Sequence, residues 1–77
     1  MNIDRLVQMV NDIANYFAAE PDPVVGAEGV AEHLKRFWAP PMRRQILAHL
    51  DAGGEGLGAL AAAGVRRLAQ LDRVLTT

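Results

Sequence analysis

Residues 29–45 read GVAEHLKRFWAPPMRRQ, and the predicted fold is organised around them. The stretch contains the only Trp, one of the two Phe, two of the four Pro and half of the eight basic residues. Proline cannot donate a backbone hydrogen bond and disfavours helix at the residue before it, so Ala39-Pro40-Pro41 should interrupt the helix. We therefore predict an elbow, at which a helix ending near Trp38 meets a helix beginning near Pro41.

The residues before the elbow carry the pattern of two helices, at about residues 3–19 and 23–38. Asn2 and Asp22 are good N-cap residues, and Pro23 suits a first helical position. Apolar residues spaced three and four apart form one stripe in each segment, which predicts two amphipathic helices. The first stripe is Ile3, Leu6, Val7, Val10, Ile13, Ala14 and Phe17, and the second is Ala27, Val30, Ala31, Leu34, Phe37 and Trp38.

The residues after the elbow continue the helical pattern. We predict a third helix at about 41–52, a flexible Gly-rich joint at 53–58 and a fourth helix at about 57–74. The run from Ala61 to Gly64 gives the fourth helix a smooth face with little to fill space, so we expect it to pack more loosely than the others. No alternation typical of strands occurs. The sequence thus predicts a single all-α domain over residues 1–77, a small bundle of three to four short helices.

Composition narrows the class of protein. The net charge is −1, which argues against a polybasic nucleic-acid binder, and the chain has no cysteine for disulfides, thiolate-held metals or iron–sulfur clusters. No apolar run approaches the ~20 residues that cross a bilayer, and the first residues lack a signal-peptide pattern. We expect a soluble cytoplasmic protein. Because 51% of so small a chain is hydrophobic, we also expect part of its apolar surface to face another chain.

No constellation of residues predicts catalysis, a metal or a cofactor. His33 and His49 lie sixteen residues apart on different predicted helices, with no HExxH-type partner. The glycines at 53, 54, 56 and 58 have neither the GK[ST] ending of a Walker loop nor the GxGxxG spacing of a dinucleotide site. Asp12, Tyr16 and Asp51 would have to converge in a water-excluding pocket, for which four short helices leave little room. The sequence therefore predicts no enzymatic activity.

The basic residues around the elbow are the first candidates for binding. Arg43 and Arg44 fall in the first turn of their helix, where positive charge is unfavourable by roughly 0.3–1 kcal/mol. An anion or an acidic partner would offset that cost, but so would carboxylates of the same chain or water. A further possibility is a helix–turn–helix DNA-binding protein, whose base-contacting residues would be Arg43, Arg44 and Gln45. The net charge of the chain does not favour binding to DNA phosphates.

The aromatic residues at the elbow have two interpretations. Phe37 and Trp38 end an amphipathic helix, where aromatic side chains usually belong to the core. Trp and Arg are also enriched in the energetically dominant residues of protein interfaces. The sequence leaves open whether Trp38 faces the core or a partner.

These same residues carry a resemblance to a known family. The segments NIDRLVQMVNDIANYFAAEPDP and GVAEHLKRFWAPPMRRQILAHLDAGGEGLG resemble the delta subunit of soluble NAD-dependent, molybdenum-containing formate dehydrogenases, over roughly residues 2–60. The specific pieces are LVQMVNDIA with Phe17, GVAxHLxxFW with Pro40, and MRRQILAH followed by the glycine cluster. The family pattern does not fix Ala39, Pro41 or the alanine-rich segment after Leu60.

The resemblance implies a small accessory subunit that holds no cofactor. The enzyme of this family oxidises formate and passes electrons to NAD, and its larger subunits hold the molybdenum–pterin cofactor, iron–sulfur clusters and FMN. The delta subunit is associated with assembly or stability of the complex, or with maturation of the molybdenum cofactor. The implied partner is a larger formate dehydrogenase subunit, with the molybdenum-containing one as the first candidate.

The predicted function is thus that of a non-catalytic interaction protein. Its predicted contact surface is the elbow, with the residues His33, Phe37, Trp38, Met42, Arg43 and Arg44. Two roles stay open, a permanent subunit and a transient maturation factor, and the chain alone is expected to be able to self-associate. The competing hypothesis is a small helical nucleic-acid-binding regulator.

Overall fold

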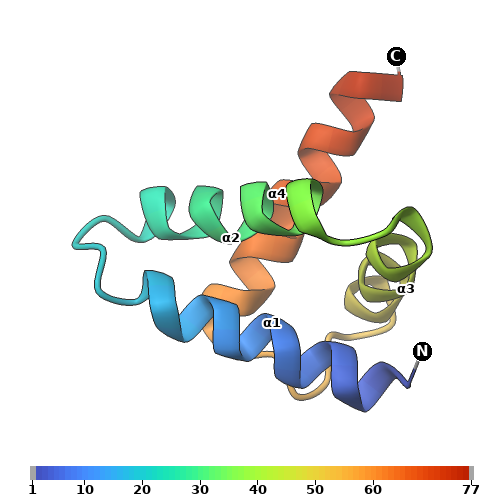
Figure 1. The fold of residues 1–77 in the computed structure, drawn as a ribbon, viewed down its shortest axis with the longest axis horizontal. Helices are drawn as coiled ribbons and strands as arrows, with labels where there is room; N and C mark the ends of the chain where they lie inside the picture. Colours follow the sequence, from blue (N-terminus) through green and yellow to red (C-terminus); the bar gives the residue numbers. More distant parts are fainter. Residues whose placement is uncertain (1, 77) are drawn as a thin grey trace.

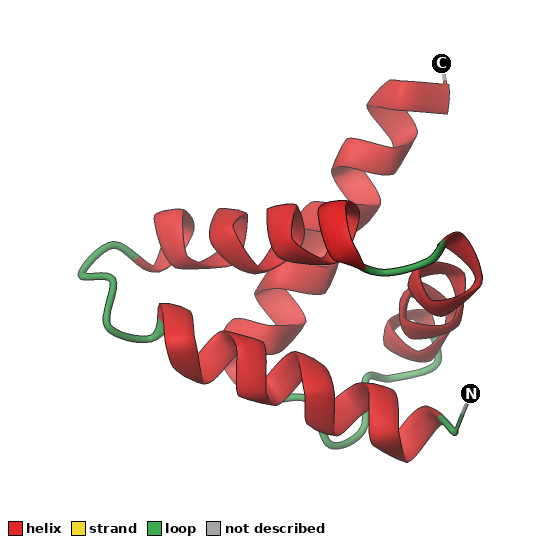
Figure 2. Ribbon diagram, viewed as in Figure 1, coloured by secondary structure: helices red, strands yellow, loops and turns green. Residues whose placement is uncertain are grey.

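The computed structural model describes residues 2–76, with side chains described for residues 2–72. Within this range the chain forms four helices, α1 (Ile3–Phe17), α2 (Pro23–Phe37), α3 (Pro40–Asp51) and α4 (Ala59–Thr76), joined by loops without any strand (Figure 2). The all-α prediction is confirmed. The helices end within two residues of the predicted positions, which is the usual uncertainty of a helix boundary.

The helix ends follow from local chemistry. The Asn2 side chain accepts a hydrogen bond from the Asp4 amide at 2.9 Å, and the Asp22 carboxylate accepts one from the Val24 amide at 2.9 Å. Both caps satisfy donors that the first turn of a helix leaves without an intrahelical partner. Ala39 is extended, at ψ 148°, because the residue before a proline avoids the helical region, and Trp38 is extended as well, at ψ 138°.

Two antiparallel helices form the frame on which the others pack. Figure 1 shows α1 and α2 running in opposite directions from the turn that joins them, with α4 crossing the pair and α3 at the end opposite the turn. The most extensive helix contact is between α2 and α4, and α3 packs on α1 and α4. The elbow between α2 and α3 and the α1–α2 turn therefore lie at opposite ends of α2.

All four helices supply side chains to one core. Its fully buried large residues are Leu6, Val10, Val30, Leu34, Ile46, Val65 and Leu68. The expectation that α4 packs loosely is wrong. Gly64 lets the two backbones approach so closely that a Cβ at this position would lie 2.4 Å from Val30 Cγ1, and Ala61 is fully buried. The small residues of α4 permit close packing, because small side chains bring helix axes together.

The glycine joint is fixed in place by side chains from two helices. Asn11 in α1 donates from Nδ2 to the Gly56 carbonyl at 2.9 Å and accepts from the Gly58 amide at 2.9 Å. His49 donates from Nε2 to the Glu55 carbonyl at 2.7 Å. Glycine is required here because residues 53, 54 and 56 have positive φ angles. The joint predicted to be flexible is thus tied to α1 and α3.

Candidate partner-binding surface

Trp38 belongs to the core. It is the C-cap residue of α2, and its backbone amide donates to the Leu34 carbonyl at 3.0 Å. Only 5% of the residue is exposed, and it lies in the same buried cluster as Leu34 and Ile46. The question that the sequence left open is settled, since Trp38 faces inward.

Arg43 is held by the end of the preceding helix. Its Nη1 donates to the Lys35 carbonyl at 2.9 Å and to the Trp38 carbonyl at 2.8 Å. The last carbonyls of a helix have no intrahelical partner and carry the negative end of the helix dipole, so a guanidinium is favourable there. The positive charge of Arg43 is unfavourable at the N-terminus of α3 but favourable at the C-terminus of α2. The two carbonyls of α2 therefore offset the cost of placing Arg43 in the first turn of α3, without a carboxylate or water.

Two of the six predicted contact residues, Phe37 and Arg44, are exposed. Phe37 is 71% exposed, and its ring lies 4.9 Å from the half-buried His33 ring, centroid to centroid, at a 46° tilt. Arg44 is exposed. Met42 is half-buried and packs against the core, as Trp38 does from the other side of the elbow. Adjacent residues thus separate, with Trp38 and Arg43 holding the elbow while Phe37 and Arg44 face solvent.

The exposed aromatic surface extends beyond the elbow onto α1. A shallow groove of about 450 Å³ between α1 and α2 is lined by Asp12, Ile13, Tyr16, Phe17 and His33. The Tyr16 ring stands edge-on to Phe17, with centroids 5.0 Å apart, and Tyr16 is 78% exposed. We call Tyr16, Phe17, His33 and Phe37 the aromatic strip. Exposed apolar side chains gathered on one face often mark a binding site.

Sequence reasoning missed the part of the aromatic strip that lies on α1. Tyr16 was considered only as a possible acid or base, and Phe17 only as a stripe residue. A signal was present, because Tyr16 falls outside the apolar stripe of α1 although its ring is largely apolar. What the sequence could not supply is the antiparallel pairing that brings the end of α1 beside the middle of α2.

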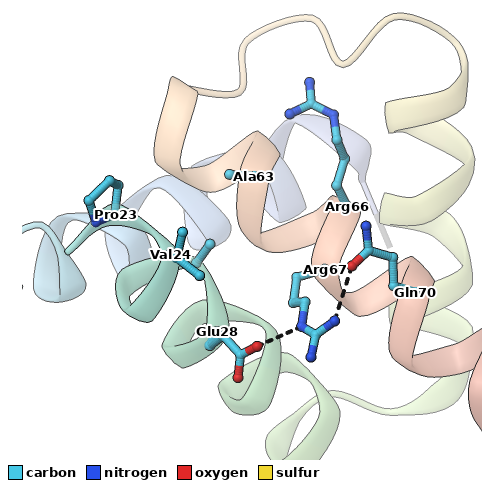
Figure 3. Close-up of a pocket in the computed structure, with 8 residues that line it drawn as sticks. Pro23, Val24, Glu28, Ala63, Arg66, Arg67 and Gln70 are labelled. Carbon is cyan, nitrogen blue, oxygen red and sulfur yellow. Dashed lines mark hydrogen bonds and ion pairs between the residues drawn. The ribbon is translucent and has the colours of Figure 1, made fainter.

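A second groove lies between α2 and α4 (Figure 3). Its apolar part is formed by Pro23, Val24, Ala27 and Ala63, and its polar edge by Glu28, Arg66, Arg67 and Gln70. Arg67 Nε and Glu28 Oε1 form an ion pair at 2.8 Å, although their geometry is not that of a hydrogen bond. Arg67 Nη1 donates a hydrogen bond to Gln70 Oε1 at 3.1 Å. Figure 3 shows Arg66 pointing away from this cluster. A partly exposed pair of this kind stabilises the fold by about 1 kcal/mol at most.

Features of two other classes of site are absent from the part of the chain that the structure describes. No group of three or more His, Cys, Asp or Glu side chains is placed to hold a metal ion there. No described helix is long and apolar enough to cross a membrane. The helix–turn–helix hypothesis also loses support, because Arg43, one of its base-reading residues, is engaged by two backbone carbonyls.

Comparison with known proteins identifies the family of this chain. Residues 5–65 match the family described as NADH-dependent formate dehydrogenase delta subunit FdsD. Neither the curated proteins nor the solved structures contain a match. The matched range holds most of α1, all of α2 and α3, the glycine joint and the first part of α4, and so includes the whole aromatic strip and the elbow. The chain therefore belongs to the family of NADH-dependent formate dehydrogenase delta subunits.

Proposed function

We propose that this protein is a non-catalytic accessory subunit, which docks on a larger subunit of a cytoplasmic formate dehydrogenase complex through the aromatic strip and Arg44. The observation that carries the proposal is the exposure of Phe37 beside an elbow that Trp38 and Arg43 fix in shape. A large apolar ring held on a rigid element loses little conformational entropy on binding, which favours affinity.

Charge supports the choice of surface. Arg44 is exposed and lies one residue after Arg43, just past the first turn of α3. A carboxylate on the partner would stabilise it, and an arginine fork suits a carboxylate well. The contact would then have an aromatic centre at Phe37 and a charged edge at Arg44, the arrangement in which most binding energy comes from the centre.

Two exposed apolar residues of α2, Phe37 and Val24, allow a matched test. Phe37→Ser removes the centre of the proposed contact, whereas Val24→Ser removes a residue of similar exposure, 68%, that lies in the α2–α4 groove. The measurement is the amount of formate dehydrogenase that co-purifies with each tagged variant, with helical circular dichroism as the check on folding. We expect Phe37→Ser to weaken binding at least tenfold, because truncating an aromatic residue that dominates an interface costs about 2 kcal/mol or more.

The control variants decide the outcome. Val24→Ser should bind as the unmodified protein does, and Arg44→Ala should bind more weakly with a smaller dependence on salt, as expected for an edge charge. Equal recovery of the complex by Phe37→Ser and the unmodified protein would exclude this surface.

The same purification separates the two possible roles in the complex. We propose that the protein assists assembly or molybdenum-cofactor maturation by binding the molybdenum-containing subunit. A permanent subunit would be present in the active enzyme in an equimolar amount. A transient maturation factor would be bound to the enzyme before cofactor insertion and missing afterwards. Quantitative mass spectrometry of the enzyme before and after activation distinguishes these cases.

A further inference from the structure

Charge is segregated along the α1–α2 pair. Residues 12–32 contain five acidic side chains and no Lys or Arg, and residues 33–50 contain four basic side chains and no Asp or Glu. The acidic residues Asp12, Glu20, Asp22, Glu28 and Glu32 are all exposed. Of these, Glu20 and Asp22 lie at the α1–α2 turn, whereas Lys35, Arg36 and Arg44 lie at or near the elbow. The turn is therefore an acidic end of the helix pair and the elbow a basic end, and the two are at opposite ends of α2 (Figure 1).

The aromatic strip spans the distance between these two ends. Tyr16 lies near the α1–α2 turn, at the end of α1, and Phe37 lies at the elbow, at the end of α2. The groove lined by Ile13 and His33 runs between them, and His33 contacts Phe37. The face thus has an exposed ring at each end of a groove, with negative charge beside one ring and positive charge beside the other.

We infer that the α1–α2 face binds a second copy of this chain in an antiparallel arrangement. Two copies that meet face to face are related by a two-fold axis that lies in the interface. If the axis runs along α2, like-charged ends meet and repel. If it runs across α2, the acidic end of each copy meets the basic end of the other, and Phe37 of each copy lies beside Tyr16 of the other. Charge complementarity therefore selects the second arrangement.

The size of the face sets the expected affinity. Two adjacent 15-residue helices present a face about 22 Å long, and with their side chains they bury about 500–600 Å² per copy. The total of about 1,000–1,200 Å² is at the lower end for a specific protein–protein interface. We therefore expect a reversible dimer with a dissociation constant in the micromolar range, and not an obligate one.

This dimer uses the surface proposed for docking, so self-association and docking would exclude each other. A chain released from the enzyme complex would then cover its aromatic strip with a second copy of itself. The inference does not depend on the proposed function, because it is tested on the isolated chain. A monomeric chain whose Phe37→Ser variant fails to dock would refute only the dimer, and a dimeric chain whose variant docks normally would refute only the docking surface.

The test is analytical ultracentrifugation of the full chain over a range from about 1 to 500 μM, which brackets a micromolar constant. We expect a monomer–dimer equilibrium that shifts toward monomer as salt increases, because the ends attract each other. Phe37→Ser should be monomeric over the whole range, and Val24→Ser should dimerise as the unmodified chain does. A chain that stays monomeric throughout, or a dimer that survives Phe37→Ser, would overturn the inference.

Charge reversal tests the antiparallel arrangement directly. Arg36→Glu with Arg44→Glu takes the net charge of residues 33–50 from +4 to 0, and Asp12→Lys with Glu20→Lys takes that of residues 12–32 from −5 to −1. We expect each double variant alone to self-associate more weakly than the unmodified chain, and the equimolar mixture to associate more strongly than either, because it pairs the unchanged acidic end of one variant with the unchanged basic end of the other. Unchanged self-association of either double variant would contradict the arrangement.

Discussion

Gly64→Ala tests the close approach of α4 to α2. A Cβ at position 64 would lie 2.4 Å from Val30 Cγ1 and 2.6 Å from Val30 Cβ, whereas carbon atoms in contact are about 3.5–4.0 Å apart. Val30 is fully buried and β-branched, so a change of side-chain rotamer does not relieve the contact. The added methyl group must therefore push α4 away from α2.

Two opposing terms give the magnitude. Overpacking of a close-packed core costs about 1–3 kcal/mol, and the upper part of that range applies here because both contacts are with a stiff side chain. Alanine is favoured over glycine within a helix by about 0.8–1.0 kcal/mol. We expect a net destabilisation of about 1–2 kcal/mol, which for a domain of this size lowers the melting temperature by roughly 4–16 °C.

The only tryptophan provides the assay. Because Trp38 is buried, its fluorescence should change on unfolding, and urea titration followed by this signal and by circular dichroism gives the free energy of unfolding. Gly58→Ala is the matched control, since a Cβ there meets only Asn11 Oδ1, at an ordinary 3.6 Å. The control should be unchanged or more stable by about 0.4–1 kcal/mol, through the smaller conformational entropy of its unfolded state.

A double-mutant cycle shows whether the cost arises at the predicted contact. Val30→Ala removes Cγ1, so Gly64→Ala should cost less in that background, with a coupling of at least about 0.5 kcal/mol. A Gly64→Ala variant as stable as the unmodified protein would refute the close packing of α4 on α2. A normal cost with no coupling to Val30 would place the contact elsewhere.

Two further predictions concern the hydrogen bonds that fix the elbow and the glycine joint. Arg43→Ala should lower the free energy of unfolding by about 1–2 kcal/mol, because two carbonyls at the end of α2 lose a charged donor. Arg44→Ala should change it by less than about 0.5 kcal/mol, and urea titration of both variants measures the difference. Asn11→Ala should also cost about 1–2 kcal/mol and should speed hydrogen exchange of the Gly58 amide measured by NMR. Asn15→Ala, an exposed position on the same helix, should do neither, and slow exchange at Gly58 in the Asn11 variant would contradict the role of Asn11.

Local patterns were sufficient for the helices because the physics that ends and orients them is local. Pro21, Pro23 and Pro40 act on the residue before them, and Asn2 and Asp22 cap the amides two residues later. The apolar stripes give the buried face of each helix. All of this is contained within a few residues of sequence, so the all-α architecture was predictable without knowledge of how the helices pack.

Contacts between distant residues were not predictable from the same patterns. Asn11 binds the backbone of residues 45 and 47 positions later, and any polar residue of α1 would have been an equal candidate from sequence. The partner of Arg43 is a pair of backbone carbonyls, which carry no sequence signal at all. The glycine joint and the elbow were recognised as breaks in the helical pattern, but their rigidity depends on tertiary hydrogen bonds.

The structure of the elbow explains why the stretch richest in aromatic and basic residues was difficult to interpret from sequence. Adjacent residues there have opposite environments, since Trp38 is buried beside an exposed Phe37, and Arg43 is bound to α2 beside an exposed Arg44. The extended backbone at Trp38 and Ala39 produces the first separation, and the reach of a long side chain back to α2 produces the second. Joint substitution of Trp38 and Arg43 would therefore weaken the fold and give no information on docking. Phe37 and Arg44 can be changed without disturbing either structural contact, so they are the residues on which a test of binding should rest.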